Sequence, residues 1–377
     1  MSFQDSGLPA LVALVVQNTA LVIFLKLTFR DDAVQYAAST VVLVTEIVKL
    51  LTCYCVYMAG SNNDSLSAII RQLQHQKLLF VPPLLYVVQN NLLFFGAKRL
   101  PSLIYMLCSQ TKVLTTAIMS KLILGTEINK KQYLYLVLLI FGIVIVQSQQ
   151  EGQPAHISDA PRESILLGMT AVFLASLTSA TAGVVLEKIF KMSTSSNTAI
   201  VHTIWSRNIQ MSLISIPVAV VVVYFQDSER LVGGTFFEGY DAVVWFVVVL
   251  QATGGILIAY VMKFSSNILK CLAIATSICC VAVYSVFSGE LELTTYLVMG
   301  VFLVCTSVGG YSMSTKQVYQ KKLKTSEKRK HVRQRASRCF AKFEHRASLG
   351  AGLQPQGRSA SSASRIAGEP QHGMRAR

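Results

Sequence analysis

Charged residues are scarce in this chain. Asp, Glu, Lys and Arg make up 14% of its 377 residues, whereas soluble globular chains carry about 25%. Hydrophobic residues make up 52%. This composition argues against a soluble globular domain and favours a protein that passes most of its length through a membrane.

The motifs of several enzyme and metal-site classes are also missing. The sequence contains no HExxH, no GxSxG, no Asp-rich metal motif near an apolar run, and no CxxC pair among its eight cysteines. It also lacks GxGxxG and P-loop patterns. These absences argue against a membrane protease, a lipase, a metal-dependent glycosyltransferase and an ATP-driven pump. We therefore expect no enzymatic activity, no bound metal and no cofactor.

Ten apolar runs are long enough to cross a bilayer, for which a helix needs about 20 residues. They cover residues 8–27, 37–59, 78–97, 102–124, 132–149, 165–187, 199–225, 240–262, 267–288 and 293–314. The sequence therefore predicts an all-α integral membrane domain of ten transmembrane helices in residues 1–315.

Residues 316–377 have a different composition. They hold 16 Lys and Arg against 3 Asp and Glu and are rich in Ser, Gly and Gln. We expect a disordered tail on the cytosolic side. It is either simply solvated, in agreement with the positive-inside rule, or attracted to anionic membrane lipids, and a role in binding nucleic acid is not expected. The basic residues of the short loops favour the cytosol for both termini. The loop residues on that side are Arg71, Lys77, Lys130, Lys131, Lys188, Lys191 and Lys263.

Fixed charges inside the predicted spans are the most informative feature. A charge at bilayer depth costs about 2.5–3.5 kcal/mol, so it is kept where the side chain faces a partner or an aqueous cavity. Glu46 and Lys49 are three residues apart and can pair on one helix face. They form either a structural salt bridge or a switch in which Lys49 exchanges Glu46 for a substrate phosphate. Lys112 and Lys270 have no acid within four residues, so we expect each to meet an anion from elsewhere.

Two sets of polar side chains recur at helical spacing within apolar helices, so each set forms a stripe along one face of its helix. They consist of Tyr86, Gln89 and Asn90 and of Tyr105, Ser109 and Lys112. Polar side chains in a membrane helix often join neighbouring helices. Donors and acceptors gathered on one stripe favour a second interpretation, the recognition of a base edge or of sugar hydroxyl groups.

Glycines mark a weak internal similarity. Residues 122–146 and 285–307 share an apolar helix end, a Gly, a short polar turn with Glu and another apolar helix, and Gly125 coincides with Gly289. The offset spans five helices, an odd number, so the copies would have opposite topology, as in the inverted repeats of secondary transporters. The Gly254-Gly255 pair is more typical of close helix packing than of a phosphate loop.

The chain resembles the nucleotide-sugar transporters of the drug/metabolite transporter superfamily, in the branch of the UDP-galactose, UDP-N-acetylglucosamine and CMP-sialic acid carriers. The resemblance rests on a combination of segments in family order. They are TEIVKL (45–50), VPPLLYVVQNNLLF (81–94), IYMLCSQTKVLTTA (104–117), AGVVLEKIFK (182–191), WSRNIQMSL (205–213), GGILIAYVMKFSSNILK (254–270) and YLVMGVFLV (296–304).

The resemblance implies ten helices in two inverted five-helix repeats, with a substrate cavity on the pseudo-symmetry axis. It also implies exchange of a cytosolic nucleotide sugar for a lumenal nucleoside monophosphate, across the membrane of the Golgi or the ER. By matching motifs, the resemblance also implies which residues line the nucleotide site. They are Tyr86, Gln89, Asn90, Tyr105, Lys112, Ser179, Asn208 and Lys270, with Glu46 and Lys49 beside the sugar-phosphate.

Several positions depart from the family pattern. Met106 stands where Gln is common, Ser109 and Ser212 stand where related carriers have Tyr, and Ser266 replaces an Asp. A UDP-sugar such as UDP-N-acetylglucosamine or UDP-galactose is the expected substrate. The alternatives are a CMP-sialic acid or multi-sugar carrier and, outside the class, a membrane scaffold or a membrane enzyme. The sequence leaves open whether the chain forms a homodimer.

Overall fold

The computed structural model describes residues 7–28, 36–60, 77–150, 162–192, 197–315 and 317–318. Its helices are α1 Gly7–Leu27, α2 Ala38–Gly60, η1 Lys77–Phe80, α4 Val81–Ala97, α5 Ser102–Leu124, α6 Lys130–Gln150, α7 Arg162–Lys191, α8 Asn197–Gln226, α9 Ser228–Val232, α10 Ala242–Phe264, α11 Asn267–Phe287 and a final helix, Thr295–Thr315. Each predicted span corresponds to one long helix.

Within these described ranges, nine helices are long and apolar enough to cross a membrane. Helix α5 is not among them, although it is 23 residues long. It carries two lysines and several hydroxyl and amide side chains, which make it less apolar than its neighbours. The described part of the chain is thus all-helical and consistent with an integral membrane protein. The arrangement of ten spans in two repeats stays a prediction.

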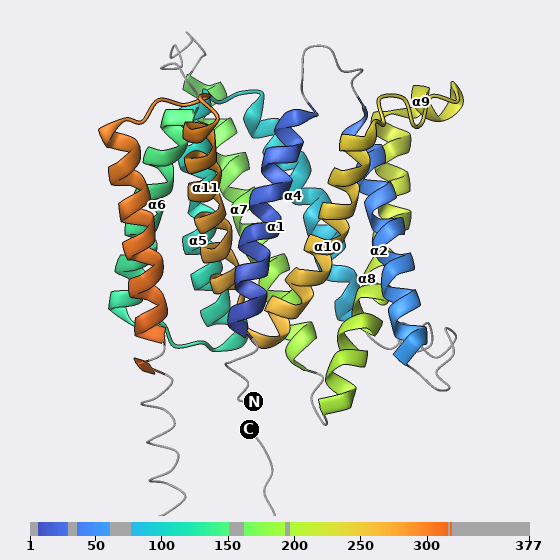
Figure 1. Ribbon diagram of the computed structural model, residues 1–377, viewed down its shortest axis with the longest axis horizontal. Helices are drawn as coiled ribbons and strands as arrows, with labels where there is room; N and C mark the ends of the chain where they lie inside the picture. The colour runs from blue at the N-terminus through green and yellow to red at the C-terminus, as the bar shows by residue number, and fades with distance from the viewer. Residues whose placement is uncertain are drawn as a thin grey trace, which may run out of the picture. The chain divides into compact units, whose positions relative to one another are not determined.

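The helices pack in an order that differs from their order in the chain (Figure 1). α4 and α5 both pack along α7, α2 packs along α8, and α1 packs along α10 and α11. Buried side chains of α5, α6, α11 and the final helix form one apolar core, which includes Val113, Leu139, Leu272 and Val304. The two helix pairs that share the predicted internal similarity therefore pack against each other.

Both glycines of that similarity adopt a left-handed backbone conformation. Gly125 follows α5 with φ 66°, and Gly289 follows α11 with φ 76°. Glycine has no Cβ and reaches this region without strain, so it is the usual residue where a helix ends in this way. The sequence similarity thus corresponds to a left-handed glycine just after a helix in both places.

Polar contacts join α1 to two distant helices. Gln17 donates a hydrogen bond to the carbonyl of Leu250 on α10 at 2.8 Å, and Asn18 donates to Ser277 on α11 at 2.6 Å. Gly254 makes the first contact feasible, because a Cβ there would lie 2.5 Å from the Gln17 amide nitrogen. The expectation that Gly254 serves close packing is confirmed.

The chain divides into two units, Met1–Thr315 and Lys316–Arg377. The long helices all belong to the first unit. The predicted disorder of the tail concerns residues that, apart from 317–318, lie outside the described part of the chain.

Candidate functional site

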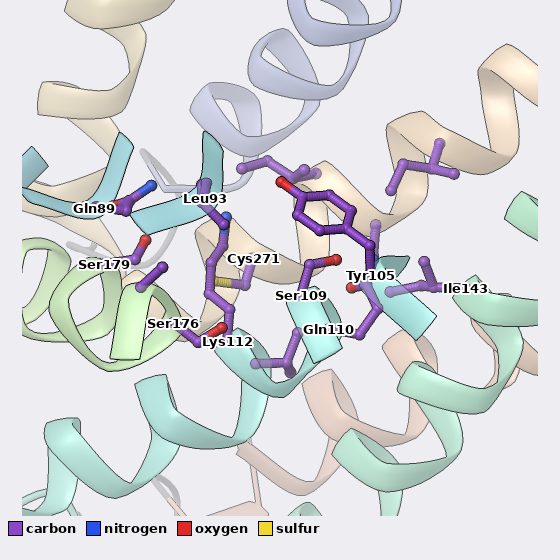
Figure 2. Close-up of a pocket in the computed structure, with 15 residues that line it drawn as sticks. Gln89, Leu93, Tyr105, Ser109, Gln110, Lys112, Ile143, Ser176, Ser179 and Cys271 are labelled. Atoms are coloured by element: carbon purple, nitrogen blue, oxygen red, sulfur yellow. The ribbon is translucent and has the colours of Figure 1, made fainter. Parts of the chain in front are cut away.

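A cavity of about 250 Å³ lies among α4, α5, α6, α7 and α11 (Figure 2). Four of the predicted site residues line it, and they come from three helices. Its polar lining consists of Gln89, Tyr105, Ser109, Gln110, Lys112, Ser176, Ser179 and Cys271. We call it the lysine cavity, because Lys112 is its charged residue.

Helix α5 supplies most of the polar lining of the lysine cavity. Tyr105, Ser109 and Lys112 are spaced at i, i+4 and i+7, so they fall on one helix face and all three line the cavity. Figure 2 shows Lys112 between two groups, with Gln89 and Ser179 on one side and Ser109 and Tyr105 on the other. Within the described ranges, no carboxylate forms an ion pair with Lys112.

Gln89 presents an unusual acceptor at this cavity. Its amide oxygen Oε1 is buried and has no hydrogen-bond partner among the described residues. Buried polar atoms are nearly always satisfied, because leaving one without a partner costs about 1–3 kcal/mol. The Gln89 amide oxygen is therefore an unsatisfied acceptor in the wall of the lysine cavity.

A second cavity, of about 930 Å³, lies between α2, α4 and α8 and extends to α9. Three further predicted residues line it: Glu46, Tyr86 and Asn90. The predicted stripe on α4 is therefore divided, since Gln89 lines the lysine cavity instead. The two cavities border the same helix, because Gln89 lines one of them and Tyr86 the other.

Glu46 and Lys49 form the ion pair that their spacing predicts. Lys49 Nζ donates to Glu46 Oε1 at 2.6 Å, and the two side chains are 13% and 18% exposed, respectively. The other carboxylate oxygen of Glu46 is buried and has no hydrogen-bond partner within the described residues. The aliphatic part of Lys49 packs against Gly255, where a Cβ would approach Lys49 Cδ to 3.0 Å. Glu46 therefore keeps acceptor capacity at the second cavity.

Three predicted residues, Lys49, Asn208 and Lys270, line neither cavity. Asn208 is buried, and its amide donates to the carbonyl of Ile204 one turn earlier in α8, at 2.9 Å. Lys270 lies in the first turn of α11 and interacts electrostatically with Glu187. The structure does not bring these three side chains together with Lys112 and Gln89 in one cavity.

Sequence reasoning missed several lining residues. Ser176 precedes Ser179 by three residues and shares its helix face, so the helical spacing was a usable signal. Gln110 neighbours the α5 stripe and donates to Gln147 on α6 at 2.9 Å. Nothing in the local pattern singled out Asp227 and Arg230, which follow α8 and line the second cavity because the chain turns back there.

Comparison with known proteins identifies the family of the chain. A family described as nucleotide-sugar transporter matches residues 6–312. The chain belongs to the nucleotide-sugar transporter family. This confirms the resemblance drawn from the segments TEIVKL to YLVMGVFLV, and residues after 312 lie beyond the family match.

Named members of the family align with most of the chain. It is 36% identical over 312 residues to the UDP-N-acetylglucosamine/UDP-N-acetylgalactosamine transporter nstp-4 of Caenorhabditis elegans, covering 78% of this chain and 90% of that protein. It is 32% identical to the rat UDP-N-acetylglucosamine transporter, with coverages of 80% and 94%. The UDP-galactose transporter of Schizosaccharomyces pombe is 33% identical, with coverages of 80% and 86%.

The fold is also similar to that of solved structures. A protein known from its crystal structure superposes with a TM-score of 0.58 at 12% identity, covering 84% of this chain and 99% of the other. At this identity the similarity concerns the fold alone.

Proposed function

We propose that this nucleotide-sugar transporter carries a cytosolic UDP-sugar, UDP-N-acetylglucosamine or UDP-galactose, into the lumen of the Golgi or the ER in exchange for UMP. The observation that carries the proposal is Lys112 in the lysine cavity, without a carboxylate partner among the described residues. The names of the aligned family members, which transport UDP-sugars, support the substrate class.

The charge of the solute explains why a cation is needed. A nucleotide sugar carries roughly two negative charges, and moving them from water into a low-dielectric slab is prohibitive unless they are paired. Lys112 supplies a compensating charge, and Gln89 and Ser179 supply polar contacts beside it. UMP carries a similar charge and would bind the same lysine. An empty carrier, with its lysine unpaired, would change its orientation across the membrane poorly. Uptake of a nucleotide sugar would then require the release of UMP, which is exchange.

Two inverted five-helix repeats remain the architecture that we propose for residues 1–315. The matching left-handed glycines, Gly125 and Gly289, support it. The common core of the α5–α6 pair and the pair formed by α11 and the final helix supports it as well. In such an arrangement the substrate site lies between the repeats near the bilayer midplane.

Both termini are expected in the cytosol, and a glycosylation test can check this. The chain has one N-x-[ST] sequon, Asn63-Asp64-Ser65, outside the described residues. In the proposed topology it lies in a cytosolic loop, where glycosylation does not occur, so glycosidase treatment should leave the electrophoretic mobility unchanged. A mobility shift that disappears in Asn63→Gln would invert the orientation.

The decisive experiment is exchange by purified protein in liposomes. Vesicles preloaded with UMP should take up labelled UDP-N-acetylglucosamine or UDP-galactose much faster than unloaded vesicles. Vesicles preloaded with CMP and offered CMP-sialic acid test the alternative substrate class. Equal uptake by loaded and empty vesicles would contradict exchange, and no uptake of any nucleotide sugar would favour a scaffold.

A further inference from the structure

The lysine cavity ends where α7 and α11 come together. Toward the end of the bundle where α11 begins, the last residues of its lining are Ser179 on α7 and Cys271 on α11. Residues four apart share a helix face, so one further turn leads to Gly183 on α7 and to Asn267 on α11. These two residues contact each other. Their contact therefore lies between the cavity and this end of the bundle.

Asn267 packs directly against the backbone of α7. A Cβ at Gly183 would lie 2.4 Å from Asn267 Nδ2 and 2.8 Å from its Cγ, so the absence of a side chain on Gly183 makes the contact possible. Asn267 is 1% exposed, and its Oδ1 is buried with no hydrogen-bond partner among the described residues. A buried acceptor without a partner is unfavourable, so access of water to Oδ1 would stabilise a separated arrangement of the two helices.

Glu187 joins the same helices one turn further along α7. Its Oε2 accepts a hydrogen bond from the backbone N–H of Asn267, the first residue of α11, at 2.8 Å. Its Oε1 accepts from Lys191 Nζ at 2.5 Å, and the Glu187 side chain is 1% exposed. The loop placement expected for Lys191 and Lys263 is wrong, because α7 continues to Lys191 and α10 to Phe264. A carboxylate is favoured at a helix N-terminus, so Glu187 holds the start of α11 against α7.

The second cavity reaches the opposite end of the bundle. Its lining includes Ser39 at the start of α2 and Gln226 at the end of α8. These helix ends lie opposite the start of α11 (Figure 1). The arrangement seen here is thus hollowed toward one end and joined through Glu187 at the other. A carrier that loads its substrate on both sides of a membrane must open at each end in turn.

We propose that Glu187 and Asn267 form the gate between the lysine cavity and the solution at the end where α11 begins. This inference rests on the proposed function, because a gate acts in a carrier that opens at both ends. When the gate opens, water replaces Glu187 at the Asn267 N–H and supplies a donor to Asn267 Oδ1. Glu187 is a positioning residue, since it acts through the placement of α11 and lines neither cavity.

Thiol modification of Cys271 measures the opening of the gate. This residue lines the lysine cavity and is 6% exposed. In sealed Golgi-derived vesicles, with Cys271 as the single cysteine and no nucleotide added, Glu187→Ala should raise its rate of modification by an impermeant reagent outside. The rise should be about tenfold or more, as expected for loss of a hydrogen bond to a charged group. Glu187→Gln keeps an acceptor and should have a smaller effect. Lys188→Ala, at an exposed neighbouring position, should change the rate by less than about twofold.

Modification from the other side separates a gate from a loss of structure. With the reagent trapped inside the vesicles, Glu187→Ala should not raise the rate, because opening one end closes the other. A rise on both sides with a lower Tm would show that Glu187 serves the fold alone, and no rise on either side would also reject the gate. A one-sided rise in a protein that exchanges no nucleotide would retain the gate and reject the proposed function.

A reversible cross-link tests the gate without changing Glu187. Gly183→Cys combined with Asn267→Cys, in a background without other cysteines, places two sulfur atoms across the gate. The approach of a Gly183 Cβ to Asn267 Cγ, 2.8 Å, indicates that the two chains are close enough for a disulfide. Oxidation should stop nucleotide exchange and reduction should restore it, whereas Asn267→Cys alone should be insensitive to oxidation. Undiminished exchange by the fully oxidised protein would overturn the inference.

Discussion

Replacing Lys112 with alanine is expected to abolish nucleotide exchange while leaving the empty protein as stable as wild type, or more stable. The lysine lines a cavity and has no described carboxylate partner, so its removal relieves the cost of a charge inside the bundle and leaves no acid without a partner. A structural lysine paired to a buried acid would behave differently, because its loss would destabilise the fold by about 3–5 kcal/mol.

The ligand dependence of the Tm makes this expectation quantitative. UMP at a hundred times its Kd should stabilise the wild-type protein by about 2.7 kcal/mol, and this gain should be largely lost in Lys112→Ala. Lys121→Ala is the matched control, since Lys121 lies on the same helix but is exposed and lines neither cavity. Normal exchange by Lys112→Ala would refute the site, and loss of folding would favour a structural role.

Replacing Gly142 with leucine is expected to destabilise the fold strongly. A Cβ at Gly142 on α6 would lie 2.8 Å from Val304 Cγ2 and 3.0 Å from the Val304 backbone nitrogen on the final helix. Backbone cannot move aside as a side-chain tip can, so a larger residue must push the two helices apart. Overpacking typically costs about 1–3 kcal/mol. In lipid, such close packing also supplies much of the attraction between helices.

The final helix offers a control for this substitution. Gly309 is exposed, and a Cβ there would meet no heavy atom within 4 Å. Gly309→Leu should therefore leave the Tm of the detergent-purified protein near the wild-type value, whereas Gly142→Leu should lower it and reduce the monodisperse fraction. Similar Tm values for the two variants would show that the approach of α6 to the final helix is not tight.

Local periodicity explains which parts of the site the sequence predicts well. Tyr105, Ser109 and Lys112 line one cavity because helical geometry alone places them on one face. The same reasoning placed Tyr86, Gln89 and Asn90 on one stripe but did not show that the stripe borders two cavities. That division arises because α4 packs against α7 and also contacts α8, which a single-helix pattern does not record.

The sequence by itself determined the class of molecule, the positions of the long helices and the family. Apolar runs of bilayer length and their flanking turns are local properties, and the family segments are read directly along the chain. Only the tertiary structure decided which polar residues meet. It gathered Gln89, Lys112 and Ser179 from three helices and left Asn208 and Lys270 outside the cavities. It also buried Arg207 and Lys263, since the direction in which a helix turns its polar side chains depends on the helices packed around it.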